Sequence, residues 1–188
     1  MHTKIRSESG ARFMPQGKVA HRILRERAER LAKPRISDTV SEEATTYIRF
    51  QLGEKNEFYG IPYTCAKEVL QHVTPTPIPY APSFIAGVIN RRGVLLAVLD
   101  LKKFFFNVTT EYNANAYIII VTAHGMTVGV LADYVSGSDT FEPTLLDMPL
   151  QTEGGIKPEY VIGLHQGMTA ILNIEALMGD PQILRRSA

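Results

Sequence analysis

Side chains suited to binding gather between Lys67 and Leu101. Four prolines at positions 75, 77, 79 and 82 predict an extended, stiff connection with few free backbone donors. Residues 83–93 follow, with an apolar pair, an amide and two guanidinium groups between two glycines that permit positive φ or close backbone approach. Because Arg91 and Arg92 are adjacent and lead into a strand, we expect one to be structural and the other to face solvent.

No combination of residues indicates catalysis or metal binding. The sequence contains no Walker loop, Rossmann glycine fingerprint, His-Glu-x-x-His motif or EF-hand loop. None of its five histidines stands at metal-ligand spacing from another histidine or from Cys65, which has no CxxC partner. No carboxylate pair is spaced for acid–base work. Nothing in these residues therefore argues for an enzyme, a cofactor or a metal site.

The composition excludes further classes of protein. A chain of 188 residues allows one domain or two very small ones, and a net charge of +1 removes the usual electrostatic argument for nucleic-acid binding. A single cysteine rules out a disulfide framework and fits a reducing compartment. The longest apolar run, residues 116–121, is far shorter than the ~20 residues of a membrane span, and the first residues lack the apolar region of a signal peptide. We expect a cytoplasmic protein.

The first 44 residues differ from the remainder of the chain. They hold ten Lys/Arg against six Asp/Glu, a balance of +4, whereas residues 45–188 hold ten against thirteen, a balance of −3. Within this extension, Lys18 to Lys33 has apolar residues at helical spacing, and Pro34 should end the helix. Such a helix is marginal alone, so it packs on its own body, remains partly ordered, or contacts a partner protein.

The body, residues 45–188, has the pattern of a β protein. We expect strands at 46–52, with Ile48, Phe50 and Leu52 on one face, at 58–63, and at 94–99, the last buried on both faces. Two hairpins are expected, formed by residues 117–122 with 126–131 and residues 161–164 with 168–172. Asn173 should then cap a short final helix at 174–178. Many short strands with polar turns favour small closed barrels.

The run Pro82–Gly93 resembles the hallmark P-x-F-I-x-G-V-x-N-L-R-G of the CheW family of chemotaxis coupling proteins. Residues 57–61, 68–69 and 128–135 are similar to further family segments, in the same order and spacing. The resemblance covers residues 45–178. One departure is Arg91, which stands where the family usually has leucine, and the loop 141–159 and the extension carry no family assignment.

This resemblance implies two intertwined five-stranded, SH3-like β-barrels with a groove between them, and no catalytic activity. It further implies a scaffold that couples the cytoplasmic tip of methyl-accepting chemoreceptors to the regulatory domain of a CheA-type histidine kinase. Such a protein would lie at the inner face of the membrane through the receptor arrays, without entering the bilayer.

The resemblance also assigns two sets of binding residues. The receptor-facing set is Glu68, Val69, Gly87, Val88, Asn90 and Arg92. The kinase-facing set is Ile48, Tyr63 and Ala66. Arg92 takes the place of the hallmark arginine, and we expect it to form an ion pair with Glu68 beside the groove. Ordinary core packing is the alternative role for the residues of both sets.

Three other functions stay open at this point. A CheW-like adaptor could serve a non-flagellar array, such as one for twitching or gliding. A nucleic-acid-binding barrel would need a basic face studded with aromatic residues, whereas the body is net acidic. An enzyme on a barrel scaffold would need a pocket with shifted ionisable groups.

Overall fold

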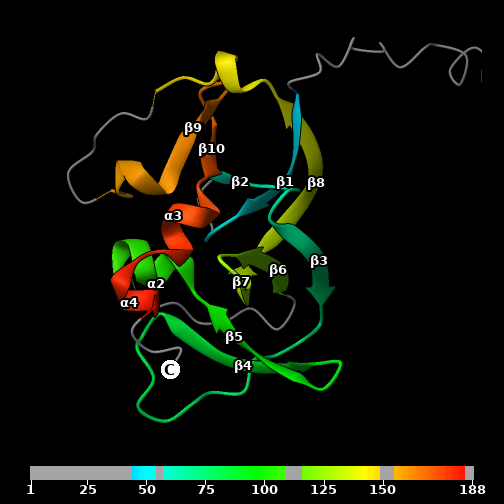
Figure 1. The fold of residues 1–188 in the computed structure, drawn as a ribbon, viewed down its shortest axis with the longest axis vertical. Helices are drawn as coiled ribbons and strands as arrows, with labels where there is room; N and C mark the ends of the chain where they lie inside the picture. Colours follow the sequence, from blue (N-terminus) through cyan, green and yellow to red (C-terminus); the bar gives the residue numbers. More distant parts are fainter. Residues whose placement is uncertain (1–43, 54–56, 109–115, 149–154, 185–188) are drawn as a thin grey trace, which may run out of the picture. The chain divides into compact units, whose positions relative to one another are not determined.

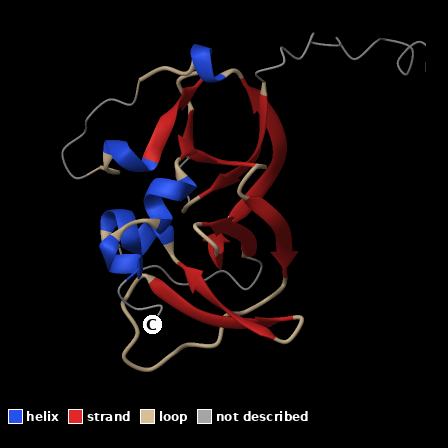
Figure 2. Cartoon of the chain, in the orientation of Figure 1, coloured by secondary structure: helices blue, strands red, loops and turns tan. Residues whose placement is uncertain are grey.

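A computed structural model describes residues 44–53, 57–108, 116–148 and 155–184, which form two five-stranded sheets and a few short helices (Figures 1 and 2). The predicted helix at Lys18–Lys33 and almost all of the extension lie outside the described residues. The prediction of a mainly β body with a short C-terminal helix is confirmed.

The first sheet has the strand order β8-β1-β2-β10-β9. Its strands are β1 (Thr45–Gln51), β2 (Phe58–Pro62), β8 (Tyr134–Phe141), β9 (Val161–His165) and β10 (Thr169–Leu172). Strands β2 and β10 run parallel, and the other neighbours in this sheet are antiparallel. Strands from both ends of the body therefore meet in one sheet.

The second sheet has the order β3-β6-β7-β5-β4. Its strands are β3 (Ala66–Gln71), β4 (Ile85–Arg91), β5 (Val94–Leu99), β6 (Tyr117–Ala123) and β7 (Met126–Ala132). Here β5 and β7 are the parallel pair. The chain enters this sheet after β2 and returns to the first sheet at β8, which intertwines the two halves as the resemblance implies (Figure 1).

Short helices connect and cover the sheets. They are α2 (Leu101–Phe106), α3 (Ile174–Met178), α4 (Pro181–Leu184) and the 3₁₀ turns η2 (Pro143–Leu145) and η3 (Pro158–Tyr160). The predicted cap is confirmed, because Asn173 Oδ1 accepts a hydrogen bond from the Ala176 amide over 3.0 Å. Helix α2 was not predicted; Asp100 caps it by accepting hydrogen bonds from two backbone amides.

Among the residues that the structure describes, three clusters of buried side chains form the core. The central cluster joins both sheets and the helices, and it includes Ile48, Phe50 and Leu52, as their alternation predicts. A second cluster lies within the second sheet and includes Ile89 and Ile118. A small third cluster in the first sheet packs Tyr47, Phe141 and Ile171 together.

Strand β5 corrects one expectation about burial. Its last residues are buried, but Val94 and Leu95 are 58% and 69% exposed. The cause is the β4–β5 hairpin, in which Arg91 pairs with Val94 and leaves Arg92 and Gly93 as a two-residue turn. The residues next to this turn lie beyond the core, so their apolar character does not place them inside.

Candidate interaction surface

An ion pair joins the two edge strands of the second sheet. Strands β3 and β4 are the first and last of that sheet, and Arg91 of β4 binds Glu68 of β3. Arg91 Nε donates to Glu68 Oε2 over 2.9 Å, and Nη2 donates to Oε1. This bidentate contact is the geometry in which arginine binds a carboxylate most strongly. It holds the sheet edges together and helps to close the barrel.

The expectation that Arg92 pairs with Glu68 is wrong. Arg91 is the last residue of β4, and it points to the same face as the buried Ile89 two positions earlier. Arg92 lies in the turn itself, where its φ is 52°, and the hydrogen bonds and ion pair of Glu68 are made with Arg91 instead. The residue at the unusual family position therefore makes the ion pair that was assigned to the hallmark arginine.

The ion pair shifts the ionisation of Glu68. The hydrogen bonds from Arg91 lower the pKa of this carboxyl, and the positive charges of Arg91 and Arg92 lower it further, although partial desolvation opposes them. The same contact raises the pKa of the Arg91 guanidinium. Both groups stay charged, so the ion pair between Glu68 and Arg91 is intact at neutral pH.

The hallmark glycine Gly87 permits a close backbone approach. Its φ is 148°, and a Cβ at this position would overlap the Thr76 carbonyl group, 2.7 Å from the carbonyl carbon. Thr76 and Val88 exchange two backbone hydrogen bonds of 2.8 Å. Gly87 therefore lets the proline-rich segment lie directly against β4.

The other receptor-facing candidates differ in exposure. Val88 is half-buried and Asn90 is exposed, with its side-chain oxygen accepting a hydrogen bond from the Gly93 amide. Val69 on β3 is 39% exposed, on the opposite face of the strand from Glu68. Val69 and Val88 thus offer apolar surface, whereas Asn90 stabilises the turn.

The kinase-facing candidates do not form one surface. Tyr63 directly follows β2 and is 50% exposed, and Ala66 is half-buried against the central core. Ile48 is buried in that core, because it lies on the same face of β1 as the buried Phe50. Ile48 therefore offers no side-chain contact to a partner, and Tyr63 is the one of the three with a prominent exposed side chain.

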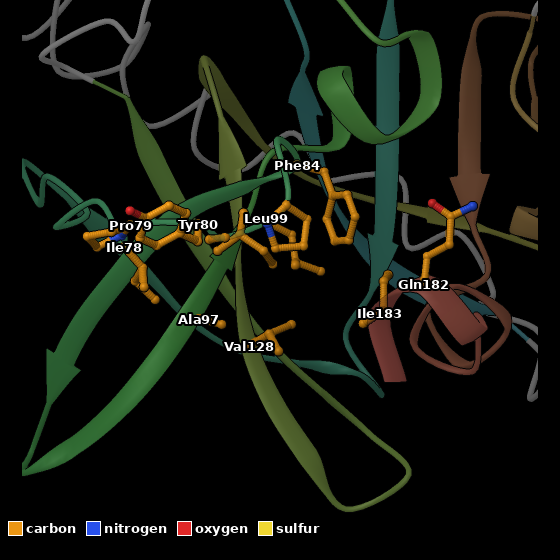
Figure 3. Close-up of a pocket in the computed structure, with 12 residues that line it drawn as sticks. Ile78, Pro79, Tyr80, Phe84, Ala97, Leu99, Val128, Gln182 and Ile183 are labelled. Carbon is orange, nitrogen blue, oxygen red and sulfur yellow. The ribbon is translucent and has the colours of Figure 1, made fainter. Parts of the chain in front are cut away.

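An apolar hollow of ≈310 Å³ lies between the proline-rich segment, strands β5 and β7, and helix α4 (Figure 3). Its lining includes Tyr80, Phe84, Ala97, Val128 and Ile183. These residues were not assigned from the sequence. The stiff run of prolines was the available signal, since it predicts an extended segment that holds its apolar side chains away from regular strands.

The described part of the chain contains no group of three or more metal-ligating side chains. Within the same residues, no helix is long and apolar enough to cross a membrane.

Comparisons with known proteins agree with this geometry. The CheW-like domain model matches residues 46–182. The chemotaxis protein CheW of Treponema pallidum is 26% identical over 156 residues, covering 79% of this chain and 91% of that protein. The CheW of Klebsiella aerogenes is 28% identical over 149 residues, covering 78% and 87%.

Two further matches bear on fold and relatives. Protein FrzA of Myxococcus xanthus is 32% identical over 107 residues, covering 57% of this chain and 66% of that protein. The crystal structure of the scaffolding protein TtCheW from Thermoanaerobacter tengcongensis matches with a TM-score of 0.62 and 29% identity, covering 73% and 94%. Because the domain model spans most of the chain and the two sheets match a CheW scaffold, the chain belongs to the CheW-like family of non-enzymatic chemotaxis adaptor proteins.

Proposed function

We propose that this adaptor couples the cytoplasmic tip of methyl-accepting chemoreceptors to the regulatory domain of a CheA-type histidine kinase. The observation that carries the proposal is the pair of exposed apolar side chains on different sheets of a CheW-like body: Tyr63 after β2 and Val69 on β3. An adaptor needs two such contacts, because it must hold both partners at once.

On the receptor side, the proposed contact is a helix laid against β3 and β4. Val69 and Val88 supply apolar surface, a mode in which a helix packs its apolar stripe into a groove. The ion pair between Glu68 and Arg91 fixes the distance between the two edge strands, and Gly87 lets the proline-rich segment pack against β4. This arrangement would keep the protein at the inner face of the membrane through its receptors.

On the kinase side, we propose Tyr63 as the main contact and Ala66 as a minor one. A half-exposed aromatic ring combines a large apolar area with a polar hydroxyl, which is why tyrosine is enriched at the energetic centres of interfaces. Ile48 acts only by supporting β1 from the core.

The test is a titration of the full chain with the kinase regulatory domain and, separately, with a receptor hairpin fragment. Tyr63→Asp should weaken kinase binding more than tenfold, about 1.4 kcal/mol or more, because a charge would be desolvated in the interface. Tyr134→Asp is the matched control, since Tyr134 is 52% exposed and, on β8, pairs with the end of β1 that lies away from Tyr63. Equal kinase affinity of both variants and the parent protein would remove Tyr63 from the interface.

A second candidate function is the same adaptor role in a non-flagellar array. This candidate is supported by the similarity to FrzA, a relative that is not named as a CheW chemotaxis protein. Deleting the gene and scoring swimming and surface motility separately distinguishes the two: loss of swimming alone supports the chemoreceptor array, and loss of surface motility alone supports the other.

A further inference from the structure

Arg49 on β1 is a half-buried arginine that forms no ion pair with any residue the structure describes. It lies on the same face of β1 as Tyr47, which is fully buried. The Arg49 Nε atom is also buried, yet no described residue accepts a hydrogen bond from it. A buried donor without an acceptor is costly, so this nitrogen marks a place where an acceptor is expected.

The guanidinium group of Arg49 is held beside an open space. Its central carbon lies 3.8 Å from the centre of the Phe58 ring on β2, which is a cation–π contact. In the strand ladder Arg49 pairs with Gly60 of β2 and with Gly137 of β8. A Cβ at Gly60 would overlap the Tyr47 ring, whereas a Cβ at Gly137 would meet no atom of the described residues within 4 Å. The space next to Arg49 is therefore filled over β2 and open over β8.

Polar groups from the two outer strands of the first sheet meet at the neighbouring Tyr47 hydroxyl. This oxygen lies 2.9 Å from His165 Nδ1 on β9 and 3.4 Å from Asp139 Oδ2 on β8, so the sheet curves around it. Burial raises the pKa of the hydroxyl and the charge of Asp139 adds to this, whereas a hydrogen bond with Thr169 and the charge of Arg49 oppose it. The open space thus borders a cation, a hydroxyl, an imidazole and one carboxylate.

These charges narrow the class of ligand that could bind. A guanidinium binds carboxylate and phosphate groups through two parallel hydrogen bonds. The exposed Asp139 carboxylate is close enough to the Tyr47 hydroxyl to repel a ligand with a second negative charge. A carboxylate carries one charge, whereas a phosphate group carries up to two at neutral pH, so the carboxylate fits better.

We propose that Arg49 binds the carboxylate of a small organic acid in the space beside Gly137. The ligand is small because the guanidinium is only partly exposed and its Nε is buried. The site goes beyond the proposed coupling function, because it uses none of the residues assigned to the receptor or to the kinase. It would give the adaptor a direct contact with an organic acid in solution.

Nuclear magnetic resonance of the isotope-labelled full chain tests this site with sodium acetate as the probe. The Arg49 Nε–H signal and the Gly137 backbone amide signal should shift saturably. Half of the change should occur at about 1–10 mM acetate, because a bidentate contact consists of only two charge-assisted hydrogen bonds. Sodium chloride at the same ionic strength should leave both signals in place, and sodium phosphate should bind more weakly than acetate.

Three variants separate the fork of Arg49 from general electrostatics, with the Gly137 amide as the common signal. Arg49→Lys keeps the charge but loses the planar fork, so acetate binding should weaken at least about fivefold. Arg92→Lys makes the same change at an exposed turn residue and should leave acetate binding unchanged. Asp139→Asn removes the repelling charge and should strengthen phosphate binding more than acetate binding.

The inference is wrong if chloride shifts the two signals as much as acetate does, or if Arg49→Lys binds acetate as the parent protein does. Phosphate binding as tight as acetate binding would contradict the assigned ligand class. If acetate has no effect but Arg49→Lys weakens binding of the kinase regulatory domain, the partner of Arg49 is a protein carboxylate. The inference then fails while the proposed coupling function stands.

Discussion

Replacing Gly87 with alanine should destabilise the protein by roughly 2–6 kcal/mol. A residue with a Cβ at a φ of 148° carries strain of about 1–3 kcal/mol. The new Cβ also overlaps the Thr76 carbonyl, which must move, so the two 2.8 Å hydrogen bonds between Thr76 and Val88 are lost or weakened. Each contributes about 0.5–1.5 kcal/mol, and together with the strain they give the stated range.

Urea unfolding of the full chain measures this change, with Gly137→Ala as the matched control. Gly137 also has a positive φ, of 125°, but a Cβ there meets no atom within 4 Å. Its substitution should therefore cost only the backbone strain, about 1–3 kcal/mol. The difference between the two variants isolates the contact with Thr76. Equal destabilisation by both substitutions would show that the close approach of the proline-rich segment contributes nothing to stability.

Three further outcomes are expected. Deleting residues 1–36 should leave one cooperative thermal transition, because the extension differs in charge and composition from the body; an aggregated product would contradict this. The lowered pKa of Glu68 means that the ion pair with Arg91 stabilises fully above pH about 4.3 and that this stabilisation is lost as the carboxylate is protonated at lower pH; melting curves from pH 3 to 7 should show a larger loss of stability in the parent protein than in Arg91→Leu, where other carboxyls such as Asp180 still titrate. Asp180→Asn should cost about 1–3 kcal/mol in urea unfolding, since the buried carboxylate accepts hydrogen bonds from the Tyr160 hydroxyl and a backbone amide, and parental stability would refute that role.

Local patterns predicted the elements that follow local rules. The hairpin of β6 and β7 has apolar strands around a His124–Gly125 turn with two positive φ values, and α3 begins at its predicted cap. Strand β8 could not be predicted this way, because its Ser, Gly and Asp residues are mostly exposed and it is held as an edge strand by pairing with β1. Its conformation depends on a tertiary contact rather than on its own sequence.

The same limit applies to the candidate surface. The resemblance located the right turn but not the arginine that binds Glu68, since that depends on which residue occupies the left-handed position of the turn. It also assigned Ile48 to a partner although the alternation on β1 points it into the core. Resemblance identifies a position in the family, whereas backbone register and turn geometry decide where its side chain points.

The strand order of the two sheets determines which sheet of this protein can fold first during synthesis on the ribosome. All strands of the second sheet lie in one continuous stretch, residues 66–132, so this sheet can form as soon as that stretch has emerged. Strands β1 and β2 emerge earlier, but β2 gains its second neighbour only when β10 is made. Until β8 emerges and pairs with β1, these two strands form a two-stranded ribbon, which is marginally stable in water and leaves its apolar side chains uncovered. If synthesis pauses after residue 132, the second sheet would be folded while β1 and β2 stay exposed and prone to aggregation. This is the state most in need of a chaperone.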